Sequence, residues 1–360
     1  MRILQVITDL RTGGAENLIV QMVPMMIARG HEVEVAVFNG VDTPFKRQLE
    51  GAGVRIHSFS NGGSVYNPVH IFRLWKLMKR FDIVHTHNTA PQLFAAVANV
   101  FHVSELVTTE HNTSNRRRDM KWYAPIDRWM YQGYRRVICI SKKAEENLRK
   151  FIGSDSDSIV TIDNGIDVRR FSEAKPIKKI CEDLPLHASV IVMVAGFRWE
   201  KDQPTLIRAL TLLPEKFHLI LVGDGYRREE FEILTEELNL NKRVHFLGLR
   251  NDIPEILKAS DFVVMSSHFE GLSLSSLEGM ASHKPFLASD VDGLREVVGG
   301  AGVLFEHENS RDLADKILAL ESDDSLRTRT VSASVNRVQS YSIDKMVDAY
   351  MAEYDKISGQ

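Results

Sequence analysis

The sequence predicts an α/β protein with two domains, each built around a parallel sheet that helices cover on both faces. At 360 residues the chain is too long for one comfortable hydrophobic core, and two domains of about 170 residues each are expected. Short apolar runs alternate with amphipathic stretches from end to end, which is typical of strands and helices in parallel sheets. The alternation pauses at residues 169–187, a charged stretch with two prolines, so we expect the interdomain linker there.

In the first half, the expected strands are short apolar runs, and the expected helices carry apolar residues at helical spacing. The strands are expected at 3–7, 33–38, 54–57, 83–86, 106–109 and 137–140, and the helices at 15–28, 69–79 and from residue 91. The first run is shorter than the roughly 7–15 apolar residues of a secretory signal. The weakly polar run at 91–103 falls short of the ~20 residues that span a bilayer, so a soluble or peripherally attached protein is expected.

The second half continues the alternation up to residue 305. Strands are expected at 190–194, 219–222, 244–247, 262–265, 285–288 and 302–305, and helices at 204–213, 227–238 and 273–282. Residues 343–357 have apolar side chains at helical spacing and are expected to form a closing helix. Because open parallel sheets bind ligands beyond the carboxyl ends of their strands, we looked for functional residues there.

Composition and missing motifs exclude several classes of function. The net charge is −3 and the pI is about 6.5, and with no nucleic-acid module a nucleic-acid partner is not expected. Cys139 and Cys181 are the only cysteines, which favours reduced core thiols and a cytoplasmic protein. Gly223 and Gly225 are followed by Arg228 where a dinucleotide fingerprint has its third glycine, which argues against a nicotinamide dehydrogenase. A phosphate-binding G-x-x-x-x-G-K-[ST] loop is also absent, which argues against a nucleoside triphosphatase.

Gly13 and Gly14 stand between the first expected strand and the first expected helix. Paired glycines at such a junction let backbone amides approach a ligand at the positive end of the helix dipole. The same pair is equally typical of an ordinary tight turn.

His85 and His87 are two residues apart on an expected strand, so their side chains point to the same face. A metal site would need a third ligand, for which Glu110 and His111 at the next strand end are the candidates. Histidines at strand ends are more often structural, and no metal is expected. His111 is the one best placed for a role in substrate binding, because it follows directly after a strand.

Residues 116–136 mix cations with aromatic side chains. Such a mixture suits an interface with anionic lipid headgroups, and it equally suits a solvated helix face. The residues are Arg116, Arg117, Arg118, Lys121, Trp122, Tyr123, Arg128, Trp129, Tyr131, Tyr134, Arg135 and Arg136.

Arg198 and Lys201 lie three residues apart where a strand of the second half leads into a helix. Arginine can grip a diphosphate through paired hydrogen bonds, and lysine through a point charge. Exposed loop cations are common, so the position beside a strand end is what favours anion binding.

Glu270 and Glu278 have seven residues between them. Paired glycosidase carboxylates lie at most about 9.5 Å apart, whereas eight residues of helix would separate these two by roughly 12 Å. A direct acid/base pair is therefore excluded if both lie on one helix. We expect Glu270 in the loop before the helix and Glu278 one to two turns inside it. The amides near Ser273 and Leu274 would face an anion, while the carboxylates accept hydrogen bonds from hydroxyls.

In order along the chain, these motifs resemble glycosyltransferase family 4, and the resemblance covers essentially the whole sequence. The E-x7-E spacing of Glu270 and Glu278 matches that family's motif. The other matching stretches are GGAE at 13–16, TEHN at 109–112, NGID at 164–167, VGDG at 222–225, FLGLRND at 246–252, ASD at 259–261 and DVDG at 290–293 followed by Glu296. The family often has Gly-Arg after the strand expected here at 190–194, whereas in this chain Arg198 comes two residues after Gly196.

The resemblance implies a GT-B fold, in which two Rossmann-like domains face a central cleft and the last helix crosses back to the first domain. On this basis residues 1–170 form the N-terminal, acceptor-side domain, 171–340 the nucleotide-sugar-binding domain and 341–360 the crossover helix.

The resemblance also implies roles for individual residues. Glu278 would bind the donor's ribose and Glu270 the hydroxyls of its sugar, while His111 would lie beside the anomeric carbon and assist catalysis. Gly13, Gly14 and the amides of Ser273 and Leu274 would surround the diphosphate, which Arg198 and Lys201 would neutralise. Backbone around Leu249 and Arg250 would meet the base.

The function that follows is a cytoplasmic, retaining, metal-independent glycosyltransferase. It would move a sugar from a nucleotide sugar, with UDP slightly favoured over GDP, to a saccharide or polyprenyl-linked acceptor in bacterial surface polysaccharide or glycolipid synthesis. No cofactor beyond the donor is implied, and the 116–136 segment would contact an anionic membrane surface. Two alternatives remain open at this point: a sugar phosphorylase or synthase on the same fold, and a non-catalytic nucleotide-sugar-binding protein. The donor's base and sugar, the acceptor, the route to retention and the oligomeric state are not readable from the sequence.

Overall fold

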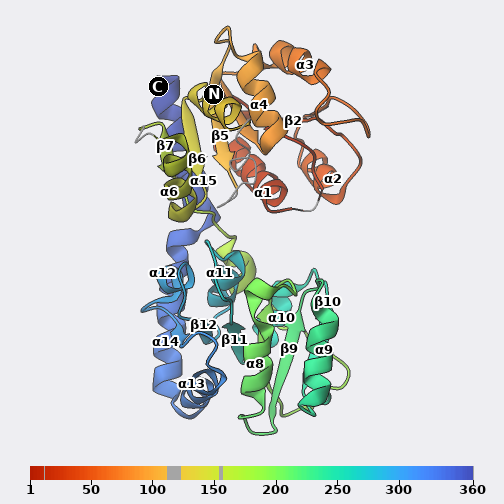
Figure 1. The fold of residues 1–360 in the computed structure, drawn as a ribbon, viewed down its shortest axis with the longest axis vertical. Coiled ribbons are helices and arrows are strands. Elements are labelled where there is room, and N and C mark those ends of the chain that lie inside the picture. Colours follow the sequence, from red (N-terminus) through yellow and green to blue (C-terminus); the bar gives the residue numbers. More distant parts are fainter. Residues whose placement is uncertain (12, 112–122, 154–156, 360) are drawn as a thin grey trace. The chain divides into compact units, whose positions relative to one another are not determined.

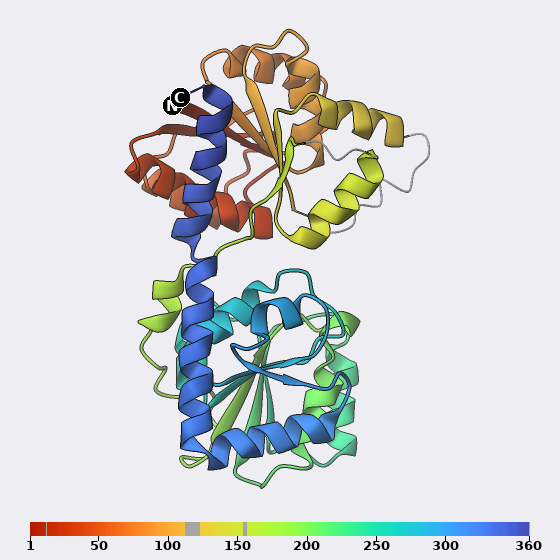
Figure 2. The same cartoon turned by 90° about the vertical axis from the view of Figure 1, so that its left-hand side faces the viewer.

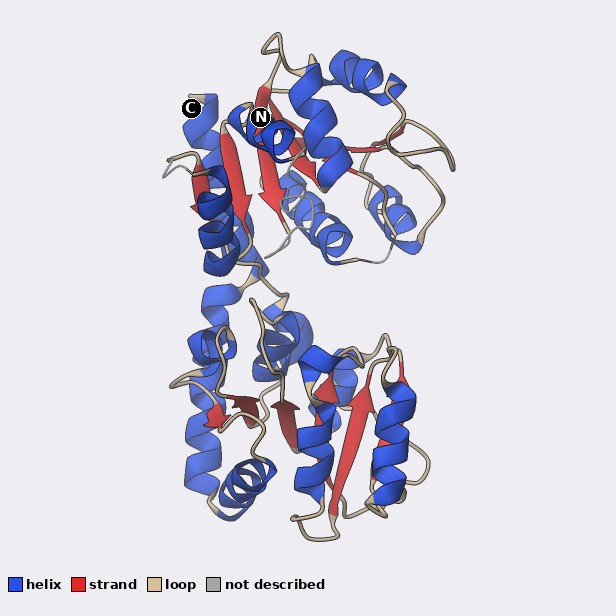
Figure 3. Ribbon diagram, in the orientation of Figure 1, coloured by secondary structure: helices blue, strands red, loops and turns tan. Residues whose placement is uncertain are grey.

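The structure is a computed structural model that describes residues 1–11, 13–111, 123–153 and 157–359 (Figure 1). The chain forms two compact units. Unit 1 comprises Met1–Asn164 and Asp344–Gln360, and unit 2 comprises Gly165–Ile343. Each unit is a sheet of parallel strands with helices packed on it (Figure 3), which confirms the predicted α/β class.

Unit 1 contains a seven-stranded parallel sheet in the order β3-β2-β1-β4-β5-β6-β7. The three central strands β1, β4 and β5 are buried at every residue except the first residue of β1 and of β5, as expected for strands covered on both faces. The strands are β1 (Arg2–Ile7), β2 (Glu32–Val37), β3 (Ile56–Ser58), β4 (Ile83–His87), β5 (Glu105–Glu110), β6 (Arg136–Cys139) and β7 (Ile159–Thr161). The helices are α1 (Gly14–Ala28), α2 (Pro44–Gly51), α3 (Val69–Met78), α4 (Thr89–Ala98), α5 (Ala124–Gln132), α6 (Lys142–Ile152) and the C-terminal α15 (Ile343–Ser358).

Unit 2 contains a six-stranded parallel sheet in the order β10-β9-β8-β11-β12-β13. The strands are β8 (Ser189–Val194), β9 (Phe217–Val222), β10 (Val244–Gly248), β11 (Phe262–Met265), β12 (Phe286–Ser289) and β13 (Val303–Phe305). The α-helices are α7 (Val168–Ser172), α8 (Gln203–Leu210), α9 (Arg228–Glu237), α10 (Ile253–Ala259), α11 (Leu274–Ala281), α12 (Leu294–Val298), α13 (Ser310–Ser322) and α14 (Asp324–Val338). Two short 3-10 turns, η2 (Trp199–Lys201) and η3 (Gln339–Tyr341), complete the unit.

Each sheet reverses its strand order at one point, between β1 and β4 in unit 1 and between β8 and β11 in unit 2. Connections leave to opposite sides at such a switch point, so a crevice forms at the carboxyl ends of the two strands. The loops after these four strands are therefore where the fold favours ligand binding.

The expected linker at 169–187 belongs to unit 2. Phe171 and Ile180 in this stretch are buried in the hydrophobic core of that unit. The first crossing between units follows Asn164, six residues before the predicted domain boundary. The charged and proline-containing composition concealed the short helix α7 and the core contacts around it.

The closing helix exists as predicted and belongs to unit 1 from Asp344 onward. Several polar contacts tie it to the rest of that unit. Arg29 Nε donates to Asp348 at 2.9 Å, Arg136 Nε donates to Glu353 at 2.7 Å, and Gln5 Nε2 donates to the Tyr354 hydroxyl at 3.2 Å.

Several elements were not predicted. The three-residue strand β7 is too short for a clear pattern, and α14 is rich in Ser, Thr and Arg. Figure 2 shows α13 and α14 in blue beside the sheet of unit 2, where Leu313, Ile317 and Val338 are buried. None of the helices in the described ranges is both long and apolar enough to cross a membrane.

Candidate functional site

In unit 1, a pocket of about 350 Å³ opens at the carboxyl ends of β1, β4 and β5. These are the strands on either side of the switch point and their neighbour. Polar side chains dominate its lining, which comprises Thr8, Asp9, Glu16, Val65, Tyr66, Asn88, Thr89, Ala90, Gln92, Thr109, Glu110 and His111. His111 is therefore part of a real recess in unit 1.

His111 begins a chain of buried hydrogen bonds that runs away from the pocket. Its Nε2 lies 2.9 Å from Nδ1 of His87, and Nε2 of His87 lies 2.8 Å from Oε1 of Gln5. The Gln5 amide donates to the Tyr354 hydroxyl, which bonds to Nδ1 of His85. His85 Nε2 then lies 2.8 Å from the Thr109 hydroxyl. The two histidines of β4 do share a face, as predicted, and their partners are neutral groups.

Burial lowers the pKa of all three histidines. The pKa of His111 falls to about 4, and those of His85 and His87 fall well below the usual value, because the charged imidazolium loses its hydration. All three rings are therefore neutral at neutral pH, and His111 can accept or donate one hydrogen bond without carrying charge.

This shift predicts that unit 1 loses stability in acid. In the unfolded chain each histidine takes up a proton near pH 6.5, whereas the folded rings stay neutral until about pH 4 for His111. Stability is thus fully present above pH 6.5 and falls as the pH drops through this window, by up to about 1.4 kcal/mol per pH unit for each ring. Hydrogen exchange of β4 and β5 between pH 7 and 4.5 measures the effect. Exchange free energies that do not change over this range would contradict it. His111→Gln should reduce the number of protons taken up on unfolding, which sets the slope of stability against pH, by about one.

The glycine turn lies at the start of α1. Gly13 is the N-cap in extended conformation, and no side chain caps the helix. A Cβ at Gly13 would lie 2.1 Å from Glu16 Oε2, and Glu16 in turn accepts a hydrogen bond from Asn88 at 3.2 Å. A side chain at position 13 would displace this glutamate, while a Cβ at Gly14 meets open space.

In unit 2, Lys201 and Glu270 meet across the switch point. Lys201 ends η2 after β8, and Glu270 lies in the loop after β11. Lys201 Nζ donates to Glu270 Oε1 at 2.5 Å, and the Ser267 hydroxyl donates to the same oxygen at 2.7 Å. The Glu270 side chain is only 10% exposed, so this pair is largely shielded from water. The structure thus brings together two of the residues that the sequence singled out.

Glu278 lies inside α11, and Glu270 precedes that helix, as predicted. The Glu278 carboxylate has no hydrogen-bond partner in the part of the chain that the structure describes. Burial raises its pKa to about 7, against which the charge of Arg170 acts only weakly. Ser273 caps α11 by accepting from the Ser276 amide at 3.3 Å.

The remaining predicted donor residues differ in their surroundings. Arg198 is exposed and precedes η2. Leu249 is 81% exposed at the end of β10. The guanidinium of Arg250 is held by both carboxylate oxygens of Asp252, with Nε donating at 2.8 Å. Arg250 is therefore committed to an internal ion pair, which leaves its backbone as the part available to a ligand.

Gly293 shapes the loop that carries Glu270. It has a φ of +81°, and a Cβ there would lie 2.4 Å from the carbonyl oxygens of Glu270 and Gly271. Only glycine permits both this conformation and this approach. The DVDG turn thus packs directly against the backbone of the loop that carries Glu270.

The predicted lipid-facing residues of the 116–136 segment differ from one another in burial. Residues 116–118, 121 and 122 lie outside the described residues. Tyr131 and Tyr134 are buried, and Arg136 pairs with Glu353 at 2.7 Å, so these three do not form a lipid-facing surface. The expectation was wrong for them because Tyr131 and Tyr134 pack in the hydrophobic core of unit 1, and Arg136 begins β6 and pairs with a residue of α15. Trp129 remains 46% exposed.

Sequence reasoning missed Gln5, Tyr354 and Ser267, which contact the predicted residues. Gln5 interrupts an apolar strand, and a polar side chain in such a strand is a usable signal of a buried hydrogen bond. Tyr354 is 349 residues from Gln5 in the chain, and no local pattern connects them.

Two family models match the chain. The description "Glycosyltransferase Family 4" matches residues 12–170, and "Glycosyl transferases group 1" matches residues 177–337. Together they cover nearly all of the chain up to residue 337.

Characterised relatives are similar over most of their length. The chain is 28% identical over 298 residues to the UDP-Gal:alpha-D-GlcNAc-diphosphoundecaprenol alpha-1,3-galactosyltransferase of Escherichia coli, covering 77% of this chain and 76% of that one. It is 26% identical over 361 residues to the phosphatidyl-myo-inositol mannosyltransferase of Mycobacterium leprae, covering 96% and 94%.

A solved structure confirms the fold. Anabaena HepE in complex with UDP has a TM-score of 0.82 and 22% identity, covering 99% of this chain and all of that one. The two parallel-sheet units and this likeness establish the GT-B fold. The chain therefore belongs to the group 1 glycosyltransferases of family 4.

Proposed function

We propose that this glycosyltransferase moves a sugar from a nucleotide-diphosphate sugar to a saccharide or lipid-linked acceptor with retention of configuration. The observation that carries the proposal is the shielded Lys201–Glu270 pair at the switch point of unit 2. Lys201 ends η2, and Glu270 lies in the loop before α11. A cation, carboxylates and helix amides in one region suit a ligand that has both phosphates and hydroxyls. A nucleotide sugar is such a ligand.

The proposed roles follow the chemistry of each group. Lys201 and Arg198 neutralise the diphosphate, and the amides of Ser273 and Leu274 bind its oxygens. Glu270 accepts hydrogen bonds from the donor sugar, and Glu278 from the ribose. Backbone at Leu249 and Arg250 meets the base. The assignment of Gly13 and Gly14 to the diphosphate stays a prediction.

Catalysis in this proposal is electrostatic. Cleavage of the donor places negative charge on the departing diphosphate and positive character on the sugar. Fixed cations and amides stabilise that charge more in the transition state than in the ground state. We propose that these protein cations take the part of a metal ion at the diphosphate.

The donor and acceptor classes rest on the relatives. The Escherichia coli relative is named for UDP-Gal and a diphosphoundecaprenol-linked sugar, and HepE was solved with UDP. We therefore favour a UDP-sugar and a lipid-linked acceptor at the cytoplasmic face of a bacterial membrane. Co-flotation with anionic vesicles tests attachment through the exposed side chains of the 116–136 segment that the structure describes, which are Arg128, Trp129 and Arg135, and a protein that stays at the bottom of the gradient would contradict it.

Product analysis tests the activity directly. The purified protein is incubated with UDP- and GDP-sugars, each with a lipid-diphosphate-linked saccharide or with inorganic phosphate. We expect a glycosylated lipid with retained configuration and released nucleoside diphosphate. A sugar phosphate formed only with phosphate would indicate a phosphorylase instead, and nucleotide binding without turnover would indicate a binding protein.

We expect His111→Ala to lower kcat by about 5–30-fold with little change in nucleotide affinity. The neutral ring offers one uncharged hydrogen bond near the transferred sugar, and such a bond contributes roughly 1–2 kcal/mol. Steady-state kinetics and calorimetric titration with UDP measure the two effects. The control is His102→Ala on the exposed turn after α4, and an unchanged kcat in His111→Ala would refute the role.

A further inference from the structure

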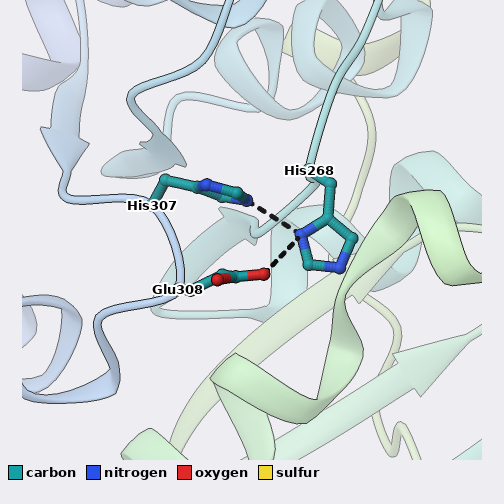
Figure 4. A group of neighbouring side chains, drawn as sticks. All are labelled: His268, His307 and Glu308. Atoms are coloured by element: carbon teal, nitrogen blue, oxygen red, sulfur yellow. Dashed lines mark hydrogen bonds and ion pairs between the residues drawn. The ribbon is translucent and has the colours of Figure 1, made fainter.

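Four potential metal ligands come together in unit 2 from three separate segments. His268 follows β11, His307 and Glu308 follow β13, and Asp202 caps α8. His268 Nδ1 is the centre of the group, at 2.8 Å from His307 Nε2, 3.3 Å from Glu308 Oε1 and 4.0 Å from Asp202 Oδ2. Figure 4 shows the side chains of His307 and Glu308 both directed at the same ring nitrogen of His268.

Hydrogen bonding alone does not satisfy this group. His268 Nδ1 either donates one proton or accepts one from His307 Nε2, so it can satisfy only one of the three atoms that face it. Asp202 is only 5% exposed, and its Oδ2 has no hydrogen-bond partner among the described residues. An unsatisfied carboxylate oxygen in a buried place is costly. A cation in place of the proton would bind the two imidazoles and Glu308, and the Asp202 carboxylate beside His268 would complete its ligands and balance its charge.

We propose that His268, His307, Glu308 and Asp202 bind one divalent transition-metal ion, with Zn²⁺ the best match. Two imidazoles and two carboxylates are ligands that Zn²⁺ accepts, and the carboxylates balance its charge. Tetrahedral bonds of about 2.0–2.2 Å separate ligand atoms by roughly 3.3–3.6 Å. From His268 Nδ1 the other three ligand atoms lie at 2.8, 3.3 and 4.0 Å, which brackets that value, and the ligand atoms of His268, His307 and Glu308 all lie within 4.8 Å of one another.

The ion would stabilise the segments that carry the Lys201–Glu270 pair. His268 lies two residues before Glu270, and Asp202 follows Lys201 directly. The role is structural, and it is separate from neutralisation of the diphosphate.

Titration of tag-free, chelator-treated full-length protein with Co²⁺ tests the site. We expect one equivalent to bind with the visible absorption of tetrahedral Co²⁺, and Zn²⁺ to displace it. Zn²⁺ at 100 times its Kd should raise the Tm by roughly 5–10 °C. Hydrogen exchange should slow at 266–271 and 306–309. Absence of binding by the wild-type protein would overturn the proposal.

Variants separate this site from other histidines. His307→Ala and Glu308→Gln change a half-buried and an exposed position of the loop after β13 and should fold, and each should weaken Co²⁺ binding by at least tenfold. The control is His245→Ala, which removes one ring of the His218–His245 pair at 3.1 Å in the same unit. Equal binding by wild type and His307→Ala would refute the assignment. None of these readouts depends on glycosyl transfer.

We also infer that Gln5 and Tyr354 determine the tautomer of His111. Gln5 Nε2 lies 3.9 Å from the sulfur of Met26, which accepts but does not donate, so Oε1 faces His87. His87 therefore donates from Nε2 and accepts at Nδ1. His111 must then donate from Nε2, which leaves the lone pair on its Nδ1.

Selective ¹⁵N-histidine NMR reads this tautomer, with His111 identified by the signals lost in His111→Ala. We expect a proton on Nε2 in the wild type. Gln5→Met removes the acceptor and should shift the proton of His111 to Nδ1 or give a mixture, whereas Gln5→Glu should retain it. Tyr354→Phe should give a mixture and Tyr350→Phe should not. An unchanged tautomer in Gln5→Met and Tyr354→Phe would refute the inference.

Discussion

Glu278→Gln should weaken nucleoside-diphosphate binding by about 10²–10³-fold. If the carboxylate accepts two hydrogen bonds from the ribose, each charged bond contributes roughly 1.5–3 kcal/mol, and an amide can accept only one bond of normal strength there. Calorimetric titration with UDP measures the loss. Because the ribose hydroxyls favour the ionised form, binding to wild type should also release a proton below pH 7, and this release should vanish in the variant.

The same substitution should stabilise the protein without ligand at pH 8. The folded pKa of about 7 exceeds the unfolded value of 4.5, so the carboxylate contributes no penalty below pH 4.5. As the pH rises from 4.5 through 7, the unfolded chain ionises first, and stability falls by about 3 kcal/mol. Urea unfolding of Glu278→Gln should therefore match wild type at pH 4.5 and exceed it at pH 8.

Glu278→Gln is thus expected to weaken nucleotide binding and at the same time to raise stability at pH 8. This combination distinguishes a functional carboxylate from a structural one. Glu236→Gln, an exposed position on α9, is the control and should change neither quantity. Lower stability at pH 8 together with normal UDP affinity would show that Glu278 is structural.

Lys201→Met should lower kcat by about 10²–10³-fold and raise KM for the donor. The substitution keeps the length of the side chain and removes the charge that stabilises the departing diphosphate, an effect of the size found for a preorganised donor at a developing anion. Among the described residues it also leaves Glu270 with only the Ser267 hydroxyl as a partner, which places an uncompensated negative charge near the phosphates.

Kinetics with saturating donor measure this loss. The control is Lys216→Met, which breaks the Lys216–Glu321 ion pair elsewhere in unit 2 and should leave turnover unchanged. In the double variant Lys201→Met, Glu270→Gln, the losses should be non-additive because the two side chains share one interaction. Turnover of Lys201→Met within threefold of wild type would refute the role.

The α/β class and the position of Glu270 before α11 could be predicted because both depend on local patterns. Apolar runs of four to six residues identify strands, and a small-residue stretch followed by an apolar face identifies a helix start. The DVDG turn was recognisable as a motif, but its purpose was not. Only the folded chain shows Gly293 against the backbone of Glu270.

The linker and the 116–136 segment show where local patterns fail. Ile180 and Phe171 stand in a charged, proline-containing stretch, yet they are buried in unit 2. Tyr131 and Tyr134 stand among cations, yet they face the core of unit 1. Burial of one side chain depends on what packs over it, and sequence neighbours do not contain that information.

The sequence by itself determined the family, the alternation of strands and helices, and the residues available for chemistry, because these are properties of residue order and spacing. Tertiary structure decided which of those residues meet and how their charges are set. Lys201 finds Glu270, 69 residues away, only because β8 and β11 are neighbours in the sheet. The neutrality of His111 likewise follows from burial beside β4, which shifts its pKa through lost hydration rather than through any neighbour in the chain.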